Sequence, residues 1–168
     1  MIRRMPVILR VLFTASCFLM LCVGARAQEK GWRGIVPLRS TREDVERLLG
    51  PSSDRGYGVT YILKDQSVFF EYSSCHRCDD KENCFNVPEY TVIRIAVSLV
   101  VKPRISNLGV DKKKFKKERN PNLPDYWYYT NAEEGIVYEV LNDDLVMSTT
   151  FQAALEDYKS LKCVYAAK

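Results

Sequence analysis

The sequence predicts an α+β domain: a twisted, mainly antiparallel sheet of five or six strands with two or three short helices on one face. Runs in which apolar and polar residues alternate, typical of half-buried strands, recur from residue 57 onward. Short segments with helix-start and helix-stop residues accompany these runs. Four cysteines after residue 70 add an expectation of disulfide bracing.

The first 27 residues are typical of a secretory signal peptide. Three arginines precede an apolar run at residues 11–23, and Ala25-Arg26-Ala27 supplies small residues for cleavage. The run is shorter than the roughly 20 residues that span a bilayer, so we expect no transmembrane span in the mature chain. Cleavage near Ala27 leaves residues 28–168 as a single domain, secreted or periplasmic, with a cysteine-bearing loop at 73–88.

Removal of this segment changes the charge balance of the protein. The whole chain has 25 basic and 21 acidic residues, and four of the basic residues, Arg3, Arg4, Arg10 and Arg26, lie in the segment. The mature chain therefore has 21 of each sign and is close to neutral, which argues against nucleic acid as its partner. We expect a monomer that binds an unknown protein or another envelope component.

The first predicted element is a short helix at residues 41–49. Ser40 and Glu43 have the spacing of a capping box, and Gly50 followed by Pro51 predicts a left-handed cap and a stop. Alternating residues at 57–63 and 68–72 then predict a hairpin. Residues 92–101 have apolar side chains at odd and at even positions, so both faces of a strand there would be at least partly covered. This pattern predicts a central strand with Ile93, Ile95 and Val97 on the core face.

The second half of the chain repeats this order. Asp111 predicts the cap of a second helix that ends at Arg119, and residues 126–130, 136–141 and 145–151 predict three more strands. A weaker helical pattern follows at 153–161. The order of one helix and three strands, met twice, suggests a pseudo-repeat, although no residue identity supports a duplication.

Cys75, Cys78, Cys84 and Cys163 are the cysteines of the mature chain. An even number of cysteines in an oxidising compartment predicts two disulfides, with three possible connectivities. As an alternative, Cys75, His76, Cys78 and Cys84 are candidate ligands for a metal, or the thiols of a redox site. Adjacent Cys75 and His76 would strain as ligands of one ion, so we expect no metal or other cofactor.

Catalysis is not expected, because the chain has one histidine, His76, and it lies among the cysteines. Two acidic pairs, at 133–134 and 143–144, lie in predicted turns where solvated acids are ordinary. We therefore name no catalytic residue.

The candidate binding surface is a basic run followed by aromatic residues. It comprises Lys112, Lys113, Lys114, Lys116, Lys117, Arg119, Trp127 and Tyr129. Six positive charges in eight residues could bind an anionic lipid, a sugar polymer or an acidic protein, or form a solvated helix face. Aromatic residues at alternate strand positions could stack on a ligand or divide between core and surface.

Residues 34–51 resemble the opening of two families. One is a group of uncharacterised secreted bacterial proteins, which implies no function. The stretches that carry this resemblance further along the chain are Asn86-Val87-Pro88, residues 128–131, residues 133–136 and Leu161-Lys162-Cys163.

The second, more distant resemblance is to BamE/SmpA-like and β-lactamase-inhibitor-like proteins. It implies a small envelope scaffold or inhibitor built of helix-plus-sheet units, sometimes in tandem. The chain differs in lacking a lipidation cysteine and in having the 73–88 loop, so these roles enter as analogy. The expected function is non-catalytic binding or scaffolding in the envelope or outside the cell.

Overall fold

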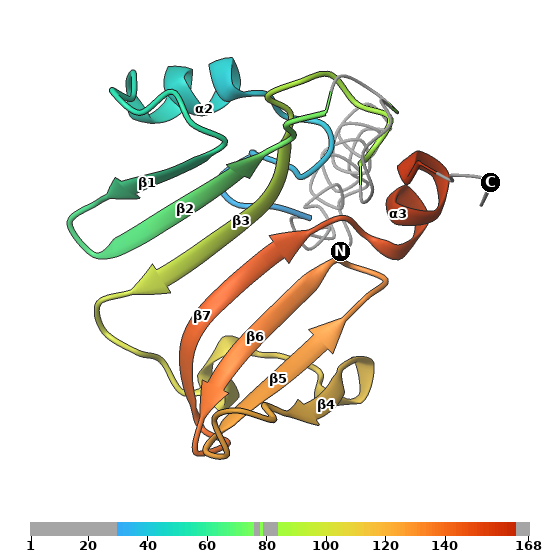
Figure 1. Cartoon of the computed structure of the whole chain (residues 1–168). Helices are drawn as coiled ribbons and strands as arrows, with labels where there is room; N and C mark the ends of the chain where they lie inside the picture. Colours follow the sequence, from blue (N-terminus) through green and yellow to red (C-terminus); the bar gives the residue numbers. More distant parts are fainter. Residues whose placement is uncertain (1–29, 76–77, 79–83, 164–168) are drawn as a thin grey trace, which may run out of the picture.

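Seven strands form one antiparallel sheet in the order β1-β2-β3-β7-β6-β5-β4 in this computed structural model (Figure 1). The structure describes residues 30–75, 78 and 84–163, so the expected signal peptide and its cleavage site lie outside the described residues. The strands are β1 (Gly58–Ile62), β2 (Gln66–Tyr72), β3 (Val92–Leu99), β4 (Lys116–Arg119), β5 (Tyr126–Asn131), β6 (Ile136–Leu141) and β7 (Leu145–Gln152). The helices are α2 (Arg42–Leu49) and α3 (Leu155–Leu161), with 3₁₀ turns η1 (Ile105–Leu108) and η2 (Lys112–Lys114). In the described part of the chain, no helix is long and apolar enough to cross a membrane.

The α+β class and the antiparallel sheet are confirmed, but the sheet has seven strands rather than five or six. The additional strand is β4, in the segment where the sequence predicts a second helix. Asp111 does act as a cap, since its side chain accepts a hydrogen bond from the Lys113 amide at 3.1 Å, but only for the single turn η2. The chain then extends and pairs with β5, which lets Phe115 pack on Tyr138 with ring centroids 5.5 Å apart. The pseudo-repeat stays a prediction.

Helix α2 begins one residue later than the predicted capping box implies. Thr41 is its N-cap, and the Asp44 carboxylate accepts a hydrogen bond from the Thr41 amide at 2.9 Å. Ser40 is buried instead, and its hydroxyl accepts a hydrogen bond from the Val36 amide at 2.9 Å. Gly50 ends the helix at φ +91° and ψ 164°, a positive-φ conformation that favours glycine but that differs from the left-handed helical cap expected from the sequence.

Strand β3 is central as predicted, pairing with β2 on one side and β7 on the other. A bulge opposite Glu71 and Tyr72 changes its face assignment. Val92 is thereby fully buried beside Ile95, whereas Ile93 is only half-buried. The strand ends at Leu99, and Val101 beyond it is 82% exposed rather than part of the core face.

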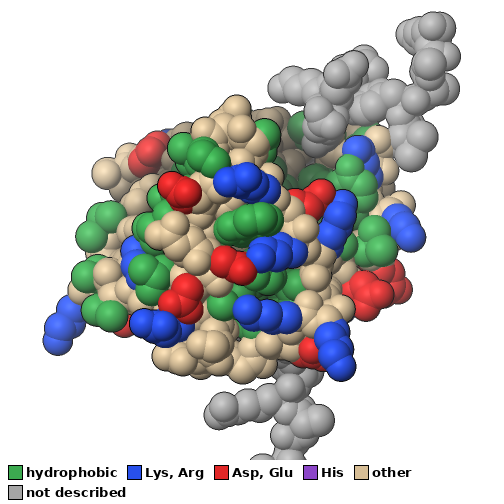
Figure 2. Space-filling view, turned by 90° about the horizontal axis from the view of Figure 1, so that it is seen from below, with side chains coloured by type: hydrophobic (Ala, Val, Ile, Leu, Met, Phe, Trp, Pro, Cys, Tyr) green, Lys and Arg blue, Asp and Glu red, His purple; other side chains and the backbone are tan. Residues whose placement is uncertain are grey.

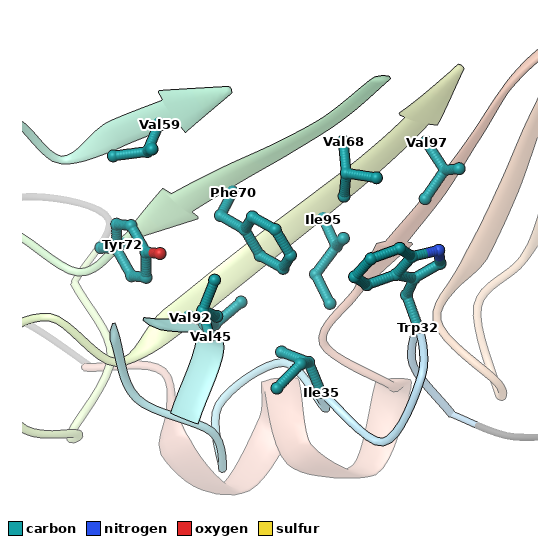
Figure 3. Packing of buried hydrophobic residues seen from close by; sticks show 10 residues of the cluster. All are labelled: Trp32, Ile35, Val45, Val59, Val68, Phe70, Tyr72, Val92, Ile95 and Val97. Atoms are coloured by element: carbon teal, nitrogen blue, oxygen red, sulfur yellow. The ribbon is translucent and has the colours of Figure 1, made fainter. Parts of the chain in front are cut away.

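One face of the sheet bears two buried clusters. The first joins β1, β2 and β3 to α2 and the segment before it: Trp32 and Ile35 of that segment and Val45 of α2 project onto Phe70 and its neighbours (Figure 3). The second lies on β5, β6 and β7 beneath Ile105. Phe151 contacts both clusters. Of the two described α-helices, α2 contributes Val45 to this core, whereas α3 has no buried residue; Trp32, Ile35 and Ile105 come from the segment before α2 and from η1.

The two edges of the sheet differ in charge. The edge strand β4 consists of four charged, exposed residues. Figure 2 shows the end of the molecule that bears β4 and the β6–β7 turn, where lysine, arginine and acidic side chains surround apolar ones. The opposite edge strand, β1, has no charged residue. Charged edge strands resist pairing with other chains, so the two edges have different capacities for association.

Candidate binding surface

The four cysteines form two disulfides, Cys75–Cys84 and Cys78–Cys163. Their Cα–Cα distances are 5.9 and 5.5 Å, within the normal range. The predicted pair of disulfides is confirmed, and the structure selects one of the three connectivities. The second bridge joins the end of the chain to the cysteine loop across 85 residues of sequence.

Disulfide-bonded sulfurs are not thiolates, so in this form the cysteines do not offer the ligands that zinc prefers. His76 lies outside the described residues. Within the ranges that the structure describes, no group of three or more His, Cys, Asp or Glu side chains is placed to hold a metal ion. The metal-binding or redox alternative stays a prediction about a reduced form.

The structure divides the predicted basic run between two sides of the molecule. Lys117 and Arg119 lie on the same face of β4 as their cross-strand partners Tyr129 and Trp127 on β5. Lys116, one position away, has the opposite orientation and pairs with Glu118 at 2.8 Å.

The lysines before β4 also separate. Lys112 returns to the aromatic side, with its Nζ 5.5 Å from the Tyr129 ring centroid. Lys114 instead lies 3.9 Å from Glu134, and Lys113 is exposed. The structure therefore keeps only part of the predicted basic run beside the aromatic residues.

Lys112, Lys117, Arg119, Trp127 and Tyr129 remain together, and we call them the cationic-aromatic surface. Lys117 Nζ lies 4.2 Å from the Trp127 ring centroid and 5.6 Å from that of Tyr129. The Arg119 guanidinium lies 5.7 Å from the Trp127 centroid. All these separations are within the range of cation–π attraction. Tyr129 is buried and Trp127 half-buried, so the tryptophan is the ring that solvent can reach.

Asp143 completes the site, and sequence reasoning missed it. Asn142 and Asp143 have positive φ, as tight hairpin turns require, and the turn brings the Asp143 carboxylate to 2.6 Å from Lys117 Nζ. The Tyr129 hydroxyl donates a hydrogen bond to the same carboxylate. The acidic pair in a turn was the available signal, but its partners are distant in sequence.

The ionisable groups at this site shift one another's pKa values. Burial alone would raise the pKa of Asp143, but hydrogen bonds from Lys117 and Tyr129 outweigh it and lower that pKa below its usual value. The hydrogen bond to Asp143 raises the pKa of Lys117. Lys117 is thus held as a cation with a fixed counterion, while no described carboxylate forms an ion pair with Lys112 or Arg119.

A separate groove of about 450 Å³ lies on the opposite face of the sheet beside the Cys75–Cys84 disulfide. Gly58, Phe69, Ile93 and Phe85 supply its apolar lining. Glu71 and Arg94 form an ion pair of 2.6 Å on its wall. None of these residues belongs to the predicted binding surface.

In comparisons with known proteins, no family model, no curated protein and no solved structure matches the chain. The resemblances described above therefore remain predictions from the sequence.

Proposed function

We propose that this chain is a non-catalytic binding domain of the cell envelope or the extracellular space, and that it binds an anionic partner on the cationic-aromatic surface. The observation that supports this proposal is the placement of three cations over two aromatic rings at one edge of the sheet. Lys112 and Arg119 have charge that no described carboxylate neutralises by an ion pair.

The partner has a definable chemistry. Cations that flank a half-buried indole favour a ligand with repeated negative charges and flat or apolar groups between them. An acidic protein segment or an acidic envelope polymer has that composition. The near-neutral mature chain lacks the global positive potential that nucleic acid requires, so selectivity must come from this local cluster.

Trp127 allows a direct measurement of binding. The chain has two tryptophans, and Trp32 is buried in the first core cluster, so a Trp32→Phe background leaves Trp127 as the reporter. We expect polyglutamate, added to residues 28–168 at low ionic strength, to change Trp127 fluorescence in a saturable manner. The affinity should fall as salt rises, because exposed charges are screened.

Two sets of variants locate the site. Lys112→Gln with Arg119→Gln should weaken binding about tenfold, since exposed charges contribute on the order of 0.5–1 kcal/mol each. Lys64→Gln with Lys159→Gln removes the same charge from exposed positions elsewhere and should leave affinity nearly unchanged. Asp143→Asn should strengthen binding, because it releases Lys117 from its counterion.

Equal losses in the two double variants would show that net charge, not this surface, governs association. No fluorescence change with polyglutamate or with an acidic polysaccharide such as heparin would overturn the proposal.

A further inference from the structure

Strand β1 is an unprotected edge of the sheet. The other edge, β4, has four charged residues, the arrangement that prevents edge-to-edge pairing. β1 has the sequence Gly-Val-Thr-Tyr-Ile, with no charge and no proline, and pairs with β2 without a bulge. Its last residue, Ile62, is 79% exposed. A regular, apolar and uncharged edge can accept another strand.

The outward hydrogen-bonding groups of β1 can be assigned from its pairing with β2. The Leu63 amide donates to the Gln66 carbonyl at 2.8 Å, and the Tyr72 amide donates to the Tyr57 carbonyl at 2.7 Å. Because antiparallel pairs alternate, odd-numbered residues bond to β2, and the main-chain groups of Gly58, Thr60 and Ile62 point outward. None of the described residues forms a main-chain hydrogen bond with these outward groups.

We propose that β1 pairs antiparallel with β1 of a second copy of this chain, with the twofold axis at Thr60. This register places Gly58 opposite Ile62 of the second copy and uses every outward group of the strand, in about six main-chain hydrogen bonds. It makes one continuous sheet across two protomers. The inference is independent of the proposed anion-binding function and differs from the monomer expected from the sequence.

The side chains of β1 complement one another in this register. A Cβ atom at Gly58 would lie 3.0 Å from the Phe69 ring, so this glycine leaves the ring uncovered at the edge. Both residues line the groove beside the Cys75–Cys84 disulfide. Ile62 of the second copy, opposite Gly58, therefore lies against the Phe69 ring, and the symmetry makes this contact twice.

The charges that flank the strand are complementary as well. Arg55 precedes β1 and Asp65 follows it; both are exposed, and the Arg55 guanidinium lies 3.6 Å from the Glu46 carboxylate of its own chain. Antiparallel pairing about Thr60 brings Asp65 of each copy toward the Arg55–Glu46 pair of the other, where the exposed guanidinium can interact with both carboxylates. Since a strand from an unrelated protein would have no reason to match both features, a second copy is the occupant that this edge fits best.

Sedimentation of residues 28–168 over a range from micromolar to millimolar concentration tests the proposal. We expect a reversible dimer. Ile62→Lys should lower the association constant at least tenfold, because it places a charge against Phe69 at two symmetric positions. Val101→Lys is the matched control, since Val101 is 82% exposed but lies outside β1, and it should leave the dimer intact.

Cysteine cross-linking tests the register. Opposed residues of a hydrogen-bonded pair have Cα atoms about 5.5 Å apart, so Thr60→Cys should form an intermolecular disulfide on mild oxidation. Two copies of Ile62→Cys would be about 14 Å apart and should not. A protein that stays monomeric throughout, or a dimer weakened equally by the two lysine variants, would overturn the proposal. A dimer cross-linked through Ile62→Cys but not through Thr60→Cys would reject this register.

Discussion

Arg42 is a buried cation whose surroundings replace a carboxylate. It is 6% exposed, and its guanidinium lies between two rings, 4.6 Å from the centroid of Tyr72 and 4.8 Å from that of Tyr90. Its two terminal nitrogens donate to the carbonyls of Asp54 and Gly56. A planar group with several donors suits this site, because it stacks on both faces while it hydrogen-bonds at its edge.

Arg42→Lys should therefore be far from conservative. An ammonium group cannot stack between two rings and bond to both carbonyls, so we expect the free energy of unfolding to fall by about 2–3 kcal/mol. Arg47→Lys on the same helix is the control, because Arg47 is 76% exposed and its change should cost no more than about 0.5 kcal/mol. Urea unfolding of the two variants makes the comparison. Equal losses would contradict a structural role for the stacked guanidinium.

Sequence reasoning could not have found the environment of Arg42. The capping pattern correctly predicts a helix around this residue, since that signal lies within a few neighbouring positions. Tyr72 and Tyr90, in contrast, belong to other segments and meet Arg42 only after the sheet and α2 have packed. Features that depend on the spacing of neighbouring residues could be predicted from the sequence, whereas contacts that depend on tertiary packing could not.

At the scale of elements, the Asp143 carboxylate joins the β6–β7 turn to β4 and β5. It pairs with Lys117 and accepts a hydrogen bond from Tyr129, as described above. Its side chain is 44% exposed, so we expect Asp143→Asn to lower the free energy of unfolding by no more than about 1 kcal/mol near pH 6.

This contribution should depend on pH in a definite direction. The folded pKa of Asp143 is lowered, so its stabilisation is present above the unfolded value of about 3.9 and is lost as pH falls through the folded pKa. The difference in unfolding free energy between the parent protein and Asp143→Asn should therefore shrink below about pH 4. Chemical denaturation at pH 6, 4 and 3 measures it. A difference that grows on acidification would contradict the assigned ion pair.

The failure to predict β4 has a physical cause at the same scale. Residues 116–119 are all charged and have no apolar alternation, so nothing within them indicates a strand. They become a strand because β5 offers an unpaired edge, and main-chain hydrogen bonds to it outweigh local helix propensity. By contrast, β2 and β3 were predictable from their own residues. Every second residue of β2 is buried, and β3 has apolar residues at odd and at even positions.

At the scale of the whole molecule, the two core clusters are joined by the pairing of β3 with β7 and by Phe151. The two disulfides close loops of very different length. Cys75–Cys84 spans 9 residues and is local, whereas Cys78–Cys163 spans 85 and links the end of the chain to the loop before β3. The long bridge restricts the unfolded chain far more than the short one does.

The two bridges should therefore contribute unequally to stability. In the chain-entropy model, removing Cys78–Cys163 with a pair of alanines costs about 4.5 kcal/mol, against roughly 2.7 kcal/mol for Cys75–Cys84. Guanidinium unfolding of the two double variants, each with its remaining disulfide intact by mass, tests this order. The long-bridge variant should also show the larger m-value, because its unfolded state exposes more surface. Because Cys84 is almost completely buried, part of any loss in the short-bridge variant will come from packing. The opposite outcome would be a larger loss for the short bridge with unchanged m-values in both variants. It would mean that the disulfides stabilise the protein through local packing around the cysteines, and not by closing the chain across both halves of the sheet.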